Sequence, residues 1–192
     1  MTPRLSILCP ALFARIGQWS IIEDVRQQCE GTDAELVVLY DDGRITVGEK
    51  CNMLHSGARG EYISMVADDD NVADDYVESL LGAIVDHGTD VVTFDVDWGS
   101  MSISDPSCKL RPLAAVRRSI AQRFRFPNWW QSEDRAFSKW LAEQSPTVTH
   151  ISKTIYIYNH RSSKPEFGGR EYPEHGRMAS SASVAKHARA QA

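Results

Sequence analysis

The sequence predicts an α/β fold in which a mainly parallel β-sheet is flanked by helices. The first observation behind this prediction is that short apolar segments, typical of strands, alternate with segments of helical spacing. The second is that polar turn residues follow the first three of these strands. Because open parallel sheets bind ligands beyond the carboxyl ends of their strands, we expect a binding site at that edge.

Each element is predicted from its own residue pattern. Apolar and β-branched runs predict strands at residues 5–10, 35–40, 62–66, 90–96 and 147–158. Amphipathic spacing predicts helices at residues 14–29, 48–58, 74–86 and 132–141. In the first helix Ile16, Trp19, Ile22 and Val25 fall on one side, and Ser132 is the expected N-cap of the last helix. Strands that alternate with helices favour parallel pairing through crossover connections.

The composition is that of one enzyme-sized domain. A chain of 192 residues with 42% hydrophobic residues can bury a core. A net charge of −5 argues against general coating of nucleic acid, and no apolar run is long enough to span a bilayer. The N-terminus lacks the long apolar region of a signal peptide, and the four cysteines show no CxxC spacing. We therefore expect reduced thiols and a cytoplasmic location.

The C-terminal end differs from the rest of the chain. From about Gly176 the sequence lacks large apolar residues apart from Met178 and Val184. Such a segment buries too little apolar surface to offset the entropy that ordering would cost. We expect a folded domain over residues 1–175 and a disordered basic and polar tail over residues 176–192.

Three consecutive carboxylates, Asp68, Asp69 and Asp70, follow the apolar strand at residues 62–66. Adjacent like charges repel, so a positive group is expected beside them. A divalent cation with a phosphate ester is one such group, since hard oxygen ligands suit Mg²⁺ and Mn²⁺. The alternative is a solvated acidic turn that precedes the next helix. Pro10 and Asp41 mark the ends of the first two strands, which places polar chemistry at the same sheet edge.

An ordered series of motifs resembles a known family. The series is SILCPA (6–11), LVVLYDDGR (36–44), VGEKCNMLHSGARGEYI (47–63), VADDDNV (66–72), LRPLAAVRRSIAQRFRFP (110–127) and SEDRAF (132–137). Together these segments resemble a compact family 2 type glycosyltransferase of the GT-A fold, of the small phage and bacterial variety. The resemblance implies a Rossmann-like sheet and a bacterial or phage-infected host cytoplasm.

The resemblance implies an inverting transfer of a sugar from a nucleotide sugar, with UDP as the expected nucleotide and Mn or Mg as cofactor. Asp69 is the expected first metal ligand. Further metal candidates are Asp68, Asp70 and His160. The expected contacts to the nucleotide sugar are Pro10, Asp41, Lys50, Asn52 and Asp68. Three alternatives remain open: Asp70 as the cap of the next helix, Asp41 as a turn residue, and His160 as a surface histidine at a strand end.

Two positions depart from the family pattern. The metal motif is usually Asp-x-Asp, and Ala67 stands at the first position of that alignment, whereas Asp68 and Asp69 satisfy the Asp-Asp variant. Where many relatives have Arg-Asn, this chain has Cys51 followed by Asn52. The phosphate contact is therefore expected on Lys50, with an ordinary solvated helix lysine as the alternative.

The residues expected to bind and activate the sugar acceptor come from the last motifs. The resemblance implies that Asp134 is the general base, with Glu133 as its neighbour, although acidic residues are favoured in any first helical turn. A basic and aromatic segment is expected to face the acceptor through Arg117, Arg118, Trp129 and Trp130. An anionic acceptor would fit such a segment, for example a hydroxymethylated base in phage-type DNA. A lipid-linked sugar or other glycan is the alternative, and so is a helix whose arginines are merely solvated.

Two other functions use similar residues. A sugar nucleotidylyltransferase would also need a parallel sheet, a nucleotide and a metal, but it usually has a glycine-rich phosphate loop after the first strand. The segment LCPALFARIG (8–17) lacks such a loop. The second alternative is a degenerate module that binds nucleotide sugars without turnover. The retained acidic pairs at residues 68–69 and 133–134 favour an enzyme.

Overall fold

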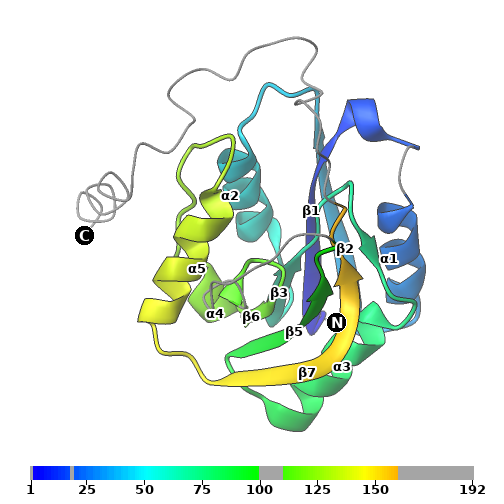
Figure 1. The fold of residues 1–192 in the computed structure, drawn as a ribbon, viewed down its shortest axis with the longest axis vertical. Helices are drawn as coiled ribbons and strands as arrows, with labels where there is room; N and C mark the ends of the chain where they lie inside the picture. Colours follow the sequence, from blue (N-terminus) through cyan, green and yellow to red (C-terminus); the bar gives the residue numbers. More distant parts are fainter. Residues whose placement is uncertain (1, 18–19, 100–109, 160–192) are drawn as a thin grey trace.

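The structure is a computed structural model, and it describes residues 2–17, 20–99 and 110–159. Within these residues a seven-stranded curled sheet has the order β2-β1-β3-β6-β5-β7-β4 (Figure 1). The predicted α/β class with a mainly parallel sheet is confirmed. His160 and the expected tail at residues 176–192 lie outside the described residues.

Five strands share one direction and two short strands oppose them. The parallel set is β1 (Leu5–Leu12), β2 (Ala34–Asp41), β3 (Tyr62–Met65), β5 (Val91–Asp97) and β7 (Val148–Ile157). The antiparallel strands are β4 (Asn71–Val72) and β6 (Ala115–Arg117), which the sequence analysis did not predict. The register of β5 against β7 shifts on either side of Asp95, an irregularity of the kind that bends a sheet.

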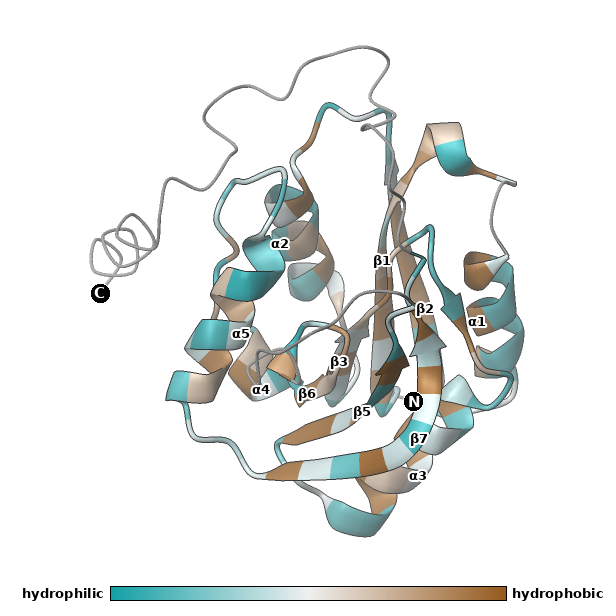
Figure 2. Cartoon of the chain, viewed as in Figure 1, coloured by the Kyte–Doolittle hydropathy of each residue, from teal (hydrophilic) through white to brown (hydrophobic). Residues whose placement is uncertain are grey.

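Helices cover both faces of the sheet. The turn η1 (Phe13–Arg15) leads to α1 (Ile21–Cys29), which lies with α3 (Tyr76–His87) on one face. The other face carries α2 (Val47–Gly57), α4 (Arg118–Ala121) and α5 (Glu133–Glu143). Side chains of β1 alternate between the two cores: Ile7 and Cys9 belong to the first, and Leu8 to the second. The apolar colour of the strands between the helices follows this arrangement (Figure 2).

The first predicted helix begins later than expected. Residues 13–15 form a 3₁₀ turn, and α1 starts only at Ile21. Gly17 has φ +76°, a left-handed conformation that interrupts helical geometry. The apolar spacing across residues 16–25 does not reveal this break, because periodicity records which face is apolar and not whether the backbone is continuous. As a result Arg15 lies at the sheet edge and not on α1.

Strand β1 continues beyond Pro10, where the sequence analysis ended it. Pro10 pairs with Leu39 of β2, while β3 on the other side ends at Met65. The N–H of Val66 donates to the carbonyl of Leu8 at 2.9 Å, the last such bond on that side. The missing N–H of Pro10 points to this same side, where no strand remains to accept it, so proline is tolerated there.

The start of α2 packs tightly against the segment that leads to α5. Thr46 caps α2 by accepting a hydrogen bond from the N–H of Glu49 at 3.1 Å. A Cβ atom on Gly48 would lie 1.9 Å from the carbonyl oxygen of Pro127. The N–H of Gly48 donates to the carbonyl of Trp129 at 3.1 Å. Only glycine permits this approach of two backbones.

Gly48→Ala is therefore expected to destabilise the fold by about 1–3 kcal/mol, as overpacking of a close contact does. Gly57 is the matched control because it lies in the same helix and its Cβ would meet nothing within 4 Å. Gly57→Ala should be neutral or add up to about 1 kcal/mol, since alanine favours helices. Urea denaturation measures both changes, and equal stabilities of the two variants would contradict the contact.

His55 is a buried histidine of the second core. Its ring meets Phe126 edge-on at 5.0 Å between centroids, and only 5% of its surface is exposed. Burial lowers the pKa of His55 to about 4, because the charged form loses its hydration. The folded pKa lies below the unfolded value of 6.5, so its contribution to stability is complete above about pH 6.5. That contribution is lost as the pH falls toward 4.

Between pH 7 and 4.5 this loss should amount to about 2–3 kcal/mol. His55→Gln removes the titrating group, so the stability of that variant should fall less over this range than that of the wild type. Denaturant titrations of both proteins at the two pH values test this, and equal losses in the two would refute it.

Candidate active site

The carboxyl ends of β1, β2 and β3 meet at one sheet edge, as the sequence predicted. Leu12 and Asp41 form the last residue pair between β1 and β2. Asp68, just beyond β3, accepts a hydrogen bond from the N–H of Leu12 at 2.8 Å. The turn after β3 is thus fixed to the end of β1, and the carboxylate of Asp68 is buried at this edge.

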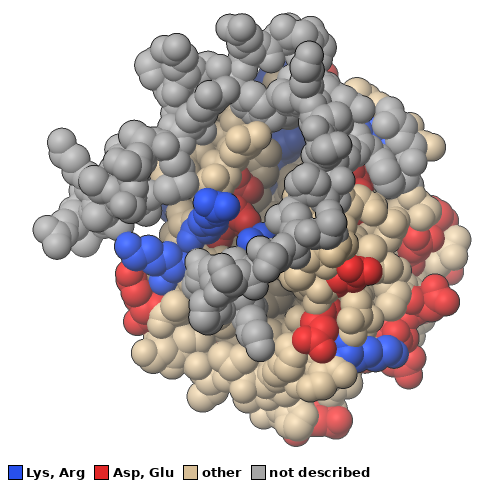
Figure 3. Space-filling model, viewed as in Figure 1, with Lys and Arg blue, Asp and Glu red and all other residues tan. Residues whose placement is uncertain are grey.

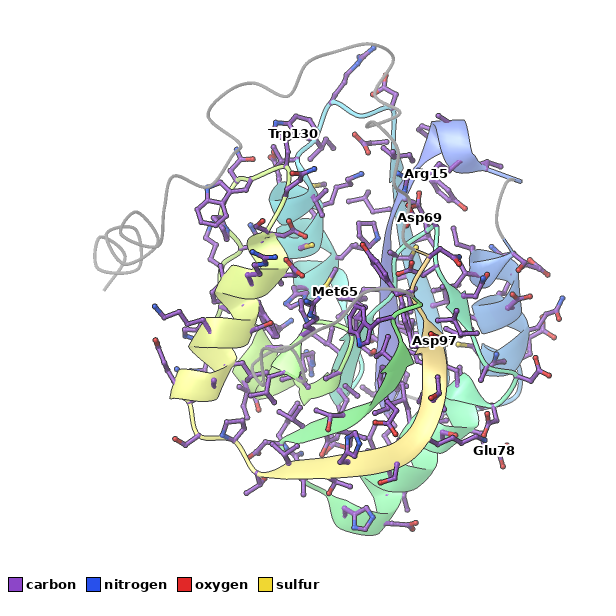
Figure 4. All side chains as sticks on the ribbon, in the orientation of Figure 1. Arg15, Met65, Asp69, Glu78, Asp97 and Trp130 are labelled. Carbon is purple, nitrogen blue, oxygen red and sulfur yellow. The ribbon has the colours of Figure 1, made fainter. Side chains whose placement is uncertain are left out.

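Arg15 supplies the positive charge that the acidic residues require. Its Nη1 atom lies 2.6 Å from Oδ1 of Asp68 and 2.9 Å from Oδ2 of Asp69. Figure 4 shows Arg15 on η1 directly beside Asp69. The alternative of a purely solvated acidic turn is wrong, because Asp68 is buried and ion-paired. Sequence analysis missed Arg15, since it assigned residues 14–29 to one helix.

Asp70 points away from its two neighbours and toward β7. Its carboxylate accepts from the hydroxyl of Tyr156 at 2.6 Å and from the N–H of Asn159 at 2.9 Å. Burial raises the pKa of Asp70 to about 6, against these hydrogen bonds. The expected alternative for Asp70, a cap of the next helix, is wrong: Asp75 stands at the N-cap of α3.

Asp41 and Lys50 form a buried ion pair. The Nζ atom of Lys50 lies 2.5 Å from Oδ1 of Asp41, and Lys50 is only 3% exposed, so the solvated alternative for this lysine is wrong. The other oxygen of Asp41 accepts from the N–H groups of Arg44 and Ile45, which confirms its turn role. Burial would raise the pKa of Asp41, but the hydrogen bond from Lys50 and those from the turn hold it below its usual value.

Both the nitrogen and the oxygen of the Asn52 carboxamide form hydrogen bonds with the backbone. Its Nδ2 atom donates to the carbonyl of Phe126 at 2.9 Å, and its Oδ1 atom accepts from the N–H of the same residue at 2.8 Å. This pair of bonds attaches α2 to the segment before α5. The structure thus gives Asn52 a structural contact at the place where the sequence analysis expected a nucleotide contact.

The start of α5 carries the Glu-Asp pair. Burial, and next the charge of Asp134, raises the pKa of Glu133 to about 7. Oδ2 of Asp134 lies 3.5 Å from Nη1 of Arg111. Ser132 stands at the N-cap position with φ +66°, but its side chain makes no capping hydrogen bond, so the expected capping role is wrong. Asp134 therefore has a partner outside the first helical turn.

A chain of contacts joins this pair to the acidic turn. The guanidinium of Arg111 lies 4.7 Å from the ring centre of Trp98, which packs against Tyr158 at 5.3 Å. The next residue, Asn159, donates through its Nδ2 atom to the carbonyl of Asp69 at 2.9 Å. Burial raises the pKa of the Tyr158 hydroxyl, and nearby charges, among them those of Asp69 and Asp134, also act on it. Sequence analysis did not select Trp98, Arg111 or Tyr158.

Two expected acceptor residues lie elsewhere. Arg117 belongs to β6 and pairs with Tyr62 at the first residue of β3, the edge opposite the acidic turn. Its guanidinium contacts Glu61 at 2.6 Å and Asp90 at 3.6 Å. Arg118 follows it, and its N–H donates to the carbonyl of Glu61. The structure therefore does not bring either arginine to the site, because β6 passes between β3 and β5 at their starts.

Trp129 and Trp130 lie in the segment between α4 and α5. The backbone of Trp129 contacts the start of α2, as described above, and both indole rings are half-buried. Figure 4 shows Trp130 across the open end of the sheet from Arg15. On the same face, acidic and basic side chains lie beside one another in a hollow (Figure 3).

A cavity of about 200 Å³ lies between η1, α1 and the sheet edge. Its lining includes Leu12 and Tyr40, from the ends of β1 and β2, with Arg15 and Asp68 on one wall. Tyr40, next to Asp41 in the chain, faces this cavity, whereas Asp41 faces Lys50 on α2, because neighbouring residues of a strand point to opposite faces.

The chemistry of the acidic turn fits a divalent cation only in part. Within residues 2–17, 20–99 and 110–159, no group of three or more His, Cys, Asp or Glu side chains could hold a metal ion. Asp68 and Asp69 nevertheless offer two hard carboxylates toward one point, where the cationic guanidinium of Arg15 lies. Further oxygen ligands, from water or phosphate, would have to complete the coordination of Mn or Mg there.

The fold is that of GT-A glycosyltransferases. TarS 1–349 of S. aureus, solved with UDP-GlcNAc, superposes with a TM-score of 0.67 over 88% of this chain and 61% of that one, at 13% identity. The longer S. aureus TarS chain matches with a TM-score of 0.67 over 80% of this chain and 36% of its own length, at 16% identity. This protein thus spans well under two thirds of TarS.

A further structure has the same fold. Glucosyl-3-phosphoglycerate synthase of Mycobacterium tuberculosis, solved with Mn²⁺, UDP-glucose and phosphoglyceric acid, has a TM-score of 0.61 and 16% identity. It covers 87% of this chain and 75% of its own length. No protein-family model matches this sequence, and neither does any curated protein sequence. Among the described helices, none is long and apolar enough to cross a membrane.

Proposed function

We propose that this protein is a metal-dependent inverting glycosyltransferase that moves a sugar from a UDP-sugar to an acceptor hydroxyl. The observation that carries the proposal is the placement of two acidic pairs at one end of a GT-A sheet. Asp68 and Asp69 end the donor strands, Glu133 and Asp134 begin α5, and the contacts of Arg111 and Tyr158 join the two pairs. The neighbours solved with UDP-GlcNAc, and with Mn²⁺ and UDP-glucose, support the donor class.

On the donor side, Asp69 and Asp68 would hold Mn or Mg. When bound, the ion would neutralise charge on the diphosphate as the bond to the sugar breaks. Lys50 positions Asp41, and Asp41 in turn shapes the loop at Arg44 and Ile45. Their buried pairing supports a positioning role for Lys50 in place of a direct phosphate contact. Pro10 and Leu12 lie near the end of β1, at the same sheet edge.

On the acceptor side, Asp134 accepts the proton of the acceptor hydroxyl as its oxygen attacks the anomeric carbon. The bond to the UDP oxygen breaks in the same displacement, so the configuration at that carbon is inverted and UDP leaves. Arg111 orients Asp134 through the 3.5 Å contact. Glu133, with a pKa of about 7, can donate a hydrogen bond to the acceptor in its protonated form.

The acceptor is a hydroxyl compound, and a hydroxymethylated base in DNA is one candidate. The arginines that suggested an anionic acceptor, Arg117 and Arg118, contact Glu61 and Asp90 at the opposite edge. A glycan or a lipid-linked sugar therefore fits the site as well as DNA does. Transfer of radiolabelled sugar to DNA that contains hydroxymethylcytosine, compared with unmodified DNA, tests the first option directly.

One observation favours a second function, a module that binds nucleotide sugars without turnover. Arg15 already neutralises the carboxylates that a catalytic metal would need. A panel of nucleotide sugars read by thermal shift with and without Mn²⁺ identifies the donor, because a ligand that binds the folded state raises its apparent stability. Slow Mn²⁺-dependent release of UDP from the stabilising donor would support the transferase. Binding without release would support the module, and no stabilisation by any donor would refute both.

A further inference from the structure

We propose that Arg15 is an internal cation that occupies the metal position in the free protein and transfers to the diphosphate when donor and metal bind together. The inference rests on the proposed function and assigns a positioning role to a residue on the turn η1. Arg15 would then make metal and nucleotide binding cooperative, because a metal ion alone must break the contacts of Arg15 that a diphosphate would replace.

The geometry of Arg15 is that of a bound cation. A single nitrogen, Nη1, lies within 2.6 and 2.9 Å of two different carboxylates. The arginine side chain is 19% exposed, and the side chains of Asp68 and Asp69 are 6% and 22% exposed. In such a shielded place charges interact more strongly than on the open surface. A divalent ion that approaches Asp68 and Asp69 must therefore displace the guanidinium first.

The turn that carries Arg15 is exposed, whereas Asp68 is buried. None of the residues of η1 is buried, and Phe13 and Ile16 are 56% and 59% exposed. Gly17 follows with φ +76°, a conformation in which glycine carries no strain. Asp68, by contrast, is fixed to the end of β1 by the 2.8 Å hydrogen bond from Leu12. Phe13 stacks on Tyr40 with 5.6 Å between the ring centroids, a contact that movement of the Arg15 side chain alone leaves in place.

The cavity beside η1 offers a place for the displaced side chain. Arg15, Ile16 and Gly17 form part of its lining together with Asp68, so the space of about 200 Å³ adjoins the present position of the guanidinium. A diphosphate held at the acidic turn would give this guanidinium a new anionic partner, since arginine binds phosphate oxygens through two parallel hydrogen bonds. The displaced cation is then paired again.

The thermodynamic consequence is a coupling between Mn²⁺ and UDP. A metal ion that binds alone must break the contacts of Arg15 with Asp68 and Asp69, whereas a diphosphate bound with the metal offers phosphate oxygens in their place. Each ligand should therefore raise the affinity of the other by the same factor, about 5- to 150-fold for typical couplings. Arg15→Gln removes the competing charge, so Mn²⁺ alone should bind more tightly to the variant, while the effect of UDP on Mn²⁺ affinity should shrink.

Isothermal titration of Mn²⁺, with and without saturating UDP, measures both quantities in the full chain. Arg4→Gln is the matched control, because Arg4 forms an exposed pair with Asp33 at the opposite edge of the sheet, and both affinities should equal those of the wild type. Arg15→Lys keeps the charge without the two parallel hydrogen bonds that arginine can offer to a phosphate, and it should fall between the wild type and Arg15→Gln. It also provides the comparison if Arg15→Gln fails to fold.

The possible results distinguish failure of the role of Arg15 from failure of the proposed function. If Arg15→Gln binds Mn²⁺ alone no more tightly than the wild type, or keeps the full coupling to UDP, the role of Arg15 is refuted while the proposed function stands. If the wild type binds neither UDP nor a UDP-sugar at any Mn²⁺ concentration, the proposed function fails and the inference fails with it. Stronger Mn²⁺ binding together with weaker coupling in the variant supports the inference.

Discussion

Asp69→Asn should abolish Mn²⁺-dependent turnover of the UDP-sugar while the protein still folds. The substitution keeps the shape of the side chain and removes one of the two carboxylates that face Arg15. A metal ion that stabilises a developing diphosphate charge contributes several kcal/mol, so the rate should fall by about a thousand-fold or more. Steady-state release of UDP at saturating Mn²⁺ measures this loss, and a Mn²⁺ titration should show weaker binding in parallel.

The stability of the Asp69→Asn variant should change little, because Asp69 is partly exposed and the hydrogen bond from Asn159 goes to its backbone carbonyl. Asp33→Asn is the control, since Asp33 is an exposed aspartate at the opposite sheet edge and its replacement should leave UDP release unchanged. Normal turnover by Asp69→Asn would remove this residue from the mechanism. Equal losses in both variants would indicate a general effect of charge.

Sequence pattern predicted the parallel part of the fold well, because those elements are long enough to show a period. The five parallel strands and the helices α2, α3 and α5 lie within a few residues of their expected bounds. Strands β4 and β6 have two and three residues, too few for any alternation to be visible. Their absence from the prediction affected the expected site, since β6 places Arg117 at the edge opposite the acidic turn.

The sheet edge that carries the acidic turn could be predicted because parallel strands end on the same side. Asp41 and Asp68 followed from this rule alone, and both lie where it puts them. No such rule predicts which residue a given side chain contacts. Lys50 contacts Asp41 through the fold and not through helical spacing, and Asn52 contacts Phe126, which is 74 residues away in the chain. Such pairs depend on how helices pack on the sheet.

Arg15 illustrates the remaining gap between pattern and site. Repulsion within the acidic triplet predicted a nearby positive charge, but the sequence contains 21 lysines and arginines, and nothing in their spacing distinguishes the one that would serve. The decisive feature is the left-handed conformation of Gly17, which interrupts helical geometry and separates residues 13–15 from α1. Gly17, with Ser20 as a possible N-cap directly before Ile21, is the signal that could have indicated it.

Asp134→Asn should lower the rate of transfer by about a hundred- to ten-thousand-fold, the usual effect of removing a general base. The amide retains the volume of the carboxylate but cannot accept the acceptor proton. Donor and metal affinity should change little, because Asp68 and Asp69 lie on a different element. Single-turnover transfer to an identified acceptor measures the rate, and NMR of the product should show an inverted anomeric centre.

Glu133→Gln separates the roles of the two neighbours. If Asp134 is the base, loss of Glu133 should have a smaller effect. The pH profile then serves as a second test, because the pKa of Glu133 is raised to about 7. A base with that pKa would lose activity as the pH falls through 7, and Glu133→Gln would abolish both the activity and this step. Such a result, with normal turnover by Asp134→Asn, would assign the base to Glu133. Normal turnover by both variants would reduce the pair to a helix start and refute the acceptor half of the proposed function.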